Sequence, residues 1–149
     1  MIKIYLDVCC LNRPFDDQRQ DRIRLESEAV LLILSHLEAH DWEWVSSDVV
    51  DWEIAQTPDV ERRTKVLFLA VSAHHAIALS QAEVDRAQQL ETLGFHSFDA
   101  LHLACAERGN VDVFLTADDQ LLRLALRLAN QLHVRVTDPV TWFQEMLQQ

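Results

Sequence analysis

The chain has 149 residues, of which 49% are hydrophobic, and its formal net charge is −11. We expect residues 1–149 to form a single domain, because this length and composition suffice to bury a core without disulfides. The acidic balance excludes a broad electrostatic grip on nucleic acid, since phosphate binding depends largely on Lys and Arg.

The apolar stretches and the cysteines exclude further classes of protein. Charged residues interrupt each apolar stretch well before it could span a membrane, and the N-terminus lacks a basic region followed by a long apolar run. We therefore expect a cytoplasmic protein without membrane contact. The three cysteines, Cys9, Cys10 and Cys105, suggest neither a disulfide framework nor a zinc site.

Strand and helix patterns alternate from the first residues onward. Leu25, Ala29 and Ile33 recur at helical spacing and give that segment one apolar face. In the first half of the chain we expect a strand at 2–6, a loop at 8–20, a helix at 21–40, a strand at 42–45, a helix from Ser46 or Ser47 to Gln56 and a helix at 59–73.

The second half continues the alternation. Its clearest helix start is the capping box Ser80-Gln-Ala-Glu83. We expect a strand at 76–79, a helix from this box to Gly94, a helix at 97–108, a strand at 113–116, a helix at 118–130, a strand at 133–136 and a terminal helix after Asp138-Pro139. This order predicts a three-layer α/β/α sandwich with a central, mostly parallel five-stranded sheet.

Four acidic residues stand where apolar segments end or helices begin. Asp7 and Asp118 each follow a predicted strand. Parallel strands end at one edge of a sheet, and ligands bind at that edge. Together with Glu53 and Asp99, these residues would form one acidic site. Such carboxylates repel one another unless a hard cation such as Mg²⁺ or Mn²⁺ lies between them.

Each acid also has a purely structural interpretation. Asp7 could cap a turn, and Asp99 could interact with a helix dipole, although an unpaired carboxylate in that apolar segment would be costly. Glu53 could be a surface side chain. Asp51 would take its place if the helix phase were shifted by two residues, whereas Asp48 looks like a helix-start residue.

The histidines and tryptophans leave two interpretations open. His102 lies three residues from Asp99 on the same helical side, so it could tune that acid, pack against another helix or face solvent. The tryptophans could stack on bases, but their apolar surroundings favour packing in or near the core. They are Trp42, Trp44, Trp52 and Trp142.

Four short segments follow one another in a defined order over nearly the whole chain. They are Tyr5-Leu6-Asp7, Ser47 six residues before Glu53, Phe98-Asp99-Ala100-Leu101-His102-Leu103-Ala104, and Phe114-Leu115-Thr116-Ala117-Asp118. This pattern resembles the PIN domain, the metal-dependent nuclease fold found in VapC-like toxins of bacterial toxin-antitoxin pairs. The resemblance implies a parallel five-stranded sheet with the four acids at its carboxyl edge around Mg²⁺ or Mn²⁺.

The resemblance also implies an activity and a set of roles. The protein would hydrolyse RNA with a metal-activated water, leaving a 5′-phosphate and a 3′-hydroxyl. Asp7, Asp99 and Asp118 would be the main metal ligands, with Glu53 as a further catalytic acid. Thr116 fits the hydroxyl position before the last acid. Asp119 is the reserve acid, because one of two adjacent aspartates commonly caps the helix.

The implied partners are RNA and an antitoxin protein that blocks the site. Apolar residues on the terminal helices could support a homodimer, or they could complete the core. Phosphate contacts would come from Arg13, Arg19 and Arg22, unless these residues pair with nearby acids instead. Those acids are Asp16, Asp17 and Glu26.

The chain departs from the family pattern directly after the first acid. PIN domains often have Thr-Asn or Ser-Asn there, whereas this chain has Val8-Cys9-Cys10, and Asn12 could supply the missing polar group. The alternative function is therefore a PIN-like module that binds RNA or protein without catalysis. A haloacid dehalogenase-like phosphatase is disfavoured, because Cys9 stands where that family has a second aspartate.

Overall fold

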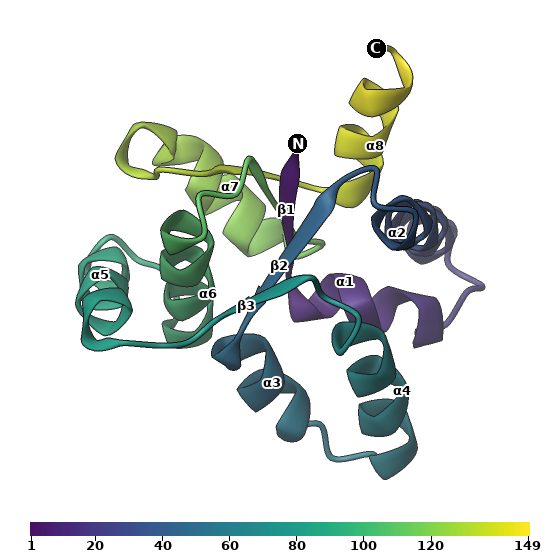
Figure 1. Ribbon diagram of the computed structural model, residues 1–149, viewed down its shortest axis with the longest axis horizontal. Helices are drawn as coiled ribbons and strands as arrows, with labels where there is room; N and C mark the ends of the chain where they lie inside the picture. The colour runs from purple at the N-terminus through teal and green to yellow at the C-terminus, as the bar shows by residue number, and fades with distance from the viewer.

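A computed structural model covers residues 1–149, and Figure 1 shows its ribbon. The chain forms one five-stranded sheet. Its strands are β1 (Lys3–Leu6), β2 (Glu43–Ser47), β3 (His75–Ile77), β4 (Val113–Leu115) and β5 (Arg135–Thr137). The strand order is β3-β2-β1-β4-β5, and all four neighbouring pairs are parallel. The predicted parallel sheet of five strands is thus confirmed.

Helices cover both faces of this sheet. They are α1 (Val8–Asn12), α2 (Asp21–Glu38), α3 (Asp48–Ala55), α4 (Val60–Ala70), α5 (Gln81–Thr92), α6 (Ser97–Arg108), α7 (Asp119–Arg127) and α8 (Pro139–Leu147), with 3-10 turns η1 (Arg13–Phe15) and η2 (Ala129–Gln131). Figure 1 shows α5 and α6 on one side of the strands and α2 and α8 on the other, which confirms the three-layer sandwich. None of the helices has the length and apolar character needed to cross a membrane.

The strand order reverses between β1 and β4. From β1 the chain runs outward to β2 and β3, and later it returns to place β4 and β5 on the other side. Leu6 is in register with Leu115, and the Asp7 amide donates to the Leu115 carbonyl at 2.9 Å. The residues that follow these two strands therefore lie side by side at the switch point, where open α/β sheets bind ligands.

The central strands are buried on both faces, as parallel strands between two helical layers must be. Ile4, Tyr5 and Leu6 belong with the residues of β4 to one apolar cluster that draws on every layer. The Tyr5 and Phe114 rings stack at 5.2 Å between centroids. This packing fixes β1 and β4 against each other and so fixes the relative positions of the side chains at their ends.

The predicted loop at 8–20 is wrong in its first half. Residues 8–12 form α1, and η1 follows directly. The cause is apolar burial, because Val8, Cys10 and Leu11 all pack into the core. Asp7 caps α1, and Pro14 is tolerated because it lies in the first turn of η1, where its missing N–H costs no hydrogen bond.

Other local signals are confirmed, although several ends differ by a few residues. Ser80 and Glu83 form the predicted capping box, and Gly94 after α5 has φ of +114°, which glycine adopts without strain. The helix predicted at 59–73 ends earlier, at Ala70. Of the tryptophans expected in or near the core, Trp44 and Trp142 are buried and Trp42 packs against the core, whereas Trp52 is 49% exposed and lies outside the core cluster.

Candidate metal centre

Asp7 lies directly after β1 and is only 5% exposed. Its Oδ1 accepts from the Val8 amide at 2.8 Å, which caps α1. Its Oδ2 accepts from the Thr116 hydroxyl at 2.7 Å and from the Cys9 thiol at 3.4 Å. Burial raises the pKa of Asp7, and the nearby charge of Glu53 adds to this, so keeping the residue ionised is costly without a cation.

Thr116 joins the ends of the two central strands. Its hydroxyl donates to Asp7 and accepts from the Asp118 amide at 3.2 Å, so one side chain positions two of the predicted acids. Cys9 lies against the same group, with its Sγ 3.3 Å from Thr116 Oγ1, and accepts from the Ala117 amide at 3.3 Å. A thiol therefore occupies the polar position after the first acid.

Glu53 reaches the centre from α3. Ser47 caps this helix by accepting from the Val50 amide, and that cap sets the helical phase. Glu53 Oε1 consequently lies 3.0 Å from Nε2 of His102, while Asp51 is exposed. Asp48 instead accepts from the Leu79 amide at 3.0 Å and holds the end of β3. The helix phase thus favours Glu53 over Asp51 as the acid of the centre.

His102 is fully buried between two acids of the centre. Its Nε2 is 3.0 Å from Glu53 and 3.9 Å from Asp7 Oδ1. On the other side of the ring, Nδ1 is 2.7 Å from the Tyr5 hydroxyl, which is 2.6 Å from Ser47 Oγ. Burial lowers the pKa of His102, but the hydrogen bond to Glu53 and the charges of the surrounding acids outweigh it and raise the pKa.

Asp99 stands in the first turn of α6 and is electrostatically coupled to the other acids. Burial raises its pKa to about 6, and the charges of Asp7, Asp118 and Glu53 contribute to the increase. His102 opposes the increase without cancelling it. The charges of the other three predicted acids therefore all act on Asp99, which places it in a region where negative charge accumulates.

The two adjacent aspartates after β4 have different surroundings. Asp118 caps α7 through Oδ1, which accepts from the Gln120 amide at 2.9 Å, and its side chain is exposed. Asp119 forms a two-pronged ion pair with Arg22, at 2.7 and 2.8 Å. Both carboxylate oxygens of Asp119 are thus engaged by Arg22, whereas Asp118 keeps its second carboxylate oxygen free.

The donor atoms suit a divalent cation. One atom each from Asp7, Glu53 and His102 lies within 4.8 Å of the others, so a small shift of the side chains would bring all three around one ion. Carboxylate oxygens are the ligands that Mg²⁺ and Mn²⁺ prefer, and Asp99 and Asp118 add more of them nearby. The residues present therefore fit a hard or intermediate divalent cation.

The three arginines predicted to contact RNA are all engaged within the chain. Arg13 pairs with Asp16 and Glu26, at 2.8 and 2.9 Å, and Arg19 pairs with Asp17 at 2.6 Å. Arg22 pairs with Asp119. Asn12 donates to the Val8 carbonyl at 3.1 Å and accepts from Arg62 at 3.3 Å, and none of its hydrogen bonds reaches the acids.

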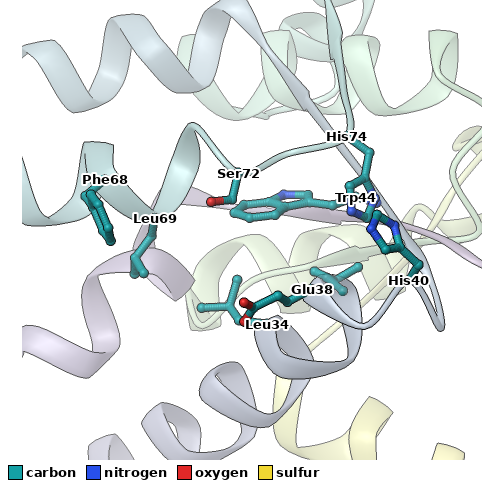
Figure 2. Close-up of a pocket in the computed structure, with 9 residues that line it drawn as sticks. Leu34, Glu38, His40, Trp44, Phe68, Leu69, Ser72 and His74 are labelled. Carbon is teal, nitrogen blue, oxygen red and sulfur yellow. The ribbon is translucent and has the colours of Figure 1, made fainter.

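Two hollows in the surface have different chemistry. One, of about 260 Å³, borders Asp99 and is lined by polar side chains of the α5 to α6 turn and α7, including His96, Gln120 and Arg127. The other, of about 510 Å³, lies between α2 and α4, away from the acids. Figure 2 shows its mostly apolar wall, with Phe68, Leu69 and Leu34 on one side and the stacked rings of His40 and His74 on the other.

Several residues of the centre gave no clear signal in the sequence. His102, Tyr5 and Ser47 have ordinary structural interpretations when taken alone. The hints are that His102 lies three residues after Asp99, that Tyr5 lies two residues before Asp7, and that Ser47 lies six residues before Glu53. The buried position of His102 excludes the interpretation that it faces solvent.

A family model described as the PIN domain matches residues 4–126. Comparison with curated proteins gives no match.

Two solved structures have similar folds. One is the crystal structure of VapBC2 from Rickettsia felis bound to a DNA fragment from their promoter. It has a TM-score of 0.59 and 14% identity, and covers 92% of this chain and 98% of that chain. The other is the structure of FitAB bound to an IR36 DNA fragment. It has a TM-score of 0.55 and 16% identity, and covers 92% and 95% of the two chains. At such identities the likeness concerns the fold.

Proposed function

This chain belongs to the PIN domain family, and on that premise we propose that it is a metal-dependent endoribonuclease and the toxin of a toxin-antitoxin pair. The observation that carries the proposal is the convergence of acidic charge on Asp99 beside the β1 to β4 switch point. The pKa of Asp99 is raised to about 6 partly by the charges of Asp7, Asp118 and Glu53. A fold gains nothing from gathering such charges unless a cation joins them.

Asp7, Asp99 and Asp118 would hold the cation, with Glu53 completing the acidic set. A bound Mg²⁺ or Mn²⁺ would activate water for attack on the phosphodiester and neutralise charge on the leaving oxygen. The chain's own groups orient this set. Thr116 donates to Oδ2 of Asp7, and the α7 cap uses Oδ1 of Asp118 and leaves its Oδ2 without a hydrogen bond.

The hollow beside Asp99 offers a path for the RNA strand. Arg127 on its wall makes no ion pair, unlike Arg13, Arg19 and Arg22, so its guanidinium is free to take a phosphate. Arg127 is nine residues from Asp118, or about 13 Å along the helix, so it would contact the strand at a distance from the cleaved bond. The three N-terminal arginines could bind RNA phosphates only if they released the carboxylates with which they are paired.

The antitoxin is the second partner in the proposal. The two structures of similar fold are those of VapBC2 and FitAB bound to DNA fragments. Because this chain has a net charge of −11, a basic partner would complement it electrostatically. Exposed apolar side chains gather on α2 and α4, beside the hollow of Figure 2, and include Phe68 at 75% exposure. We assign this surface to a basic segment of the antitoxin that carries apolar residues.

A homodimer is the third contact in the proposal. Trp142 and Phe143 of the terminal helix are buried against the rest of the chain, so they complete the core. The large apolar side chains left exposed on the last two helices are Leu126 of α7 and Leu147 of α8. Light scattering of the purified protein, with Leu126→Asp as the comparison, measures whether they join two copies.

Cleavage of RNA with and without metal tests the activity. The wild-type protein should cut single-stranded RNA in Mn²⁺ or Mg²⁺ and stop when EDTA is added. The double variant Asp7→Asn, Asp99→Asn should be inactive, whereas Asp85→Asn, an exposed acid on α5, should cut normally. Equal cleavage by the wild type and the double variant would contradict the catalytic role proposed for these acids.

The competing function is a PIN-like module that binds RNA or protein without catalysis. The observation that favours it is Cys9, because a thiol is a weaker hydrogen-bond donor to Asp7 than a hydroxyl or an amide. Such a module would bind its partner equally well after chelation and in the double variant, and would cleave under no metal condition.

A further inference from the structure

His102 lies where a ligand of the metal would lie, and this is not required by an all-carboxylate centre. Resting on the proposed function, we propose that His102 binds the divalent cation through Nε2. The centre would then select a first-row transition ion such as Mn²⁺ over Mg²⁺. Asp7 and Glu53 would supply the oxygen ligands on either side of the imidazole.

The distances around His102 suit a shared ion. Two ligands that are each about 2.1 Å from one ion lie at most about 4.2 Å apart. The ring nitrogen is 3.0 Å from Glu53 Oε1 and 3.9 Å from Asp7 Oδ1, within that limit. The ring is also fully buried, so Nε2 has no access to bulk water and faces only these two carboxylates.

The far side of the ring is built to hold an imidazole ligand. Metal-bound histidines usually place their second nitrogen against an oxygen that fixes the ring, and here Nδ1 is 2.7 Å from the Tyr5 hydroxyl. That hydroxyl is in turn 2.6 Å from Ser47 Oγ. Both hydroxyls can rotate, so Tyr5 can donate to Nδ1 or accept from it. The pair therefore supports the ring both when Nε2 carries a proton and when it carries a metal.

The donor set decides which ion is preferred. Mg²⁺ favours oxygen ligands and gives up water reluctantly, whereas imidazole nitrogen raises the affinity for first-row transition ions. A centre with Asp7, Glu53 and His102 offers two oxygen donors and one nitrogen donor. The nitrogen donor increases the affinity for Mn²⁺ but adds little for Mg²⁺, so it makes the centre selective for Mn²⁺.

Electron paramagnetic resonance of Mn²⁺ bound to the full chain tests this directly. A coordinated imidazole gives a ¹⁴N hyperfine coupling in pulsed spectra, and we expect the wild-type protein to show it. The variant His102→Gln should still bind Mn²⁺ but lose the coupling, with its Mn²⁺ affinity lower by about tenfold. Its Mg²⁺ affinity should change much less. His133→Gln, an exposed histidine before β5, is the matched control and should keep the coupling.

The outcomes separate this proposal from the proposed function. Bound Mn²⁺ with RNA cleavage but no ¹⁴N coupling would overturn the role of His102 as a ligand and leave it as a positioning residue for Glu53. A wild-type protein that binds no Mn²⁺ and cleaves no RNA would overturn the proposed function and this proposal together. If His102→Gln fails to fold, the test still stands: a wild type without the coupling overturns the proposal, and His96→Gln, which removes the other histidine beside Asp99, should keep the coupling.

Discussion

The hydroxyl of Thr116 lies 2.7 Å from the carboxylate of Asp7, although 109 positions separate the two residues in the chain. The contact exists because β1 and β4 are neighbours in register at the point where the strand order reverses. The same hydroxyl accepts from the Asp118 amide at 3.2 Å, so Thr116 joins the first and the last acid of the centre through two hydrogen bonds.

Replacing Thr116 with Val removes the donor to a buried carboxylate while keeping the shape of the side chain. We expect a loss of about 1–3 kcal/mol in the free energy of unfolding. We also expect a fall of about 10-fold to 100-fold in metal affinity or in RNA cleavage. Urea denaturation and calorimetric titration with Mn²⁺ measure the two effects. Thr116→Ser keeps the hydroxyl and should retain most of both, so an equal loss in both variants would contradict the role given to the hydrogen bond.

Asp99 should make the metal-free protein less stable as the pH rises. Its pKa is raised in the folded state to about 6, so the protonated form is favoured by folding. The stabilisation is complete below the ordinary carboxyl pKa and is lost as the pH rises through about 6. Asp99→Asn should therefore be more stable than the wild type by about 1–3 kcal/mol at pH 8.

The same difference should shrink at pH 4.5 and in saturating Mn²⁺. Protonation removes the repulsion in the first case, and the cation offsets it in the second. Denaturation of both proteins at pH 4.5 and 8, with and without Mn²⁺, gives the stability difference between them under each of the four conditions. If the Asn variant shows no gain at pH 8, the acids do not repel one another as the geometry implies.

RNA affinity should depend on Arg127 more than on the N-terminal arginines. In an Asp7→Asn background that cannot cleave, Arg127→Ala should weaken binding and reduce the salt dependence by about one phosphate contact. Arg19→Ala should have a smaller effect, because Asp17 already holds its guanidinium at 2.6 Å. Fluorescence anisotropy over a range of salt concentrations gives both quantities. A larger effect from Arg19 would move the RNA path to the N-terminal loop.

Glu83 should stabilise the fold through a charge, independently of the centre. Burial alone would raise its pKa, but hydrogen bonds from Ser80 and Arg108 lower it to about 2. This stabilisation is fully present above the ordinary glutamate pKa and is lost as the pH falls through about 2. Glu83→Gln should cost about 2–3 kcal/mol at pH 7 and much less near pH 2.

The control for this charge is the exposed Asp85 on the same helix. Asp85→Asn should change the free energy of unfolding by less than about 0.5 kcal/mol, as surface substitutions usually do. Thermal or urea denaturation at pH 7 and at pH 2.5 compares the three proteins. A Glu83→Gln penalty that stayed constant across this range would point to lost packing rather than lost charge.

The sequence by itself determined the order of the elements and the four positions at which acids end or begin them. Strand runs such as 2–6, the capping box at Ser80 and the acid after each central strand are local features, because propensity, caps and periodicity act over a few residues. A parallel sheet then brings its strand ends to one edge. For this reason the acids could be predicted, and the resemblance could be stated, without any coordinates.

Only the tertiary structure decided which groups face one another inside that edge. Burial of Val8, Cys10 and Leu11 turned the expected loop into α1, and the cap on α3 chose Glu53 over Asp51. The contacts of His102 with Glu53 and Tyr5 span 49 and 97 positions of the chain. Such contacts depend on how whole helices and strands pack, and a shift of one residue in helix phase turns a side chain by about 100°, so no local pattern in the sequence can specify them.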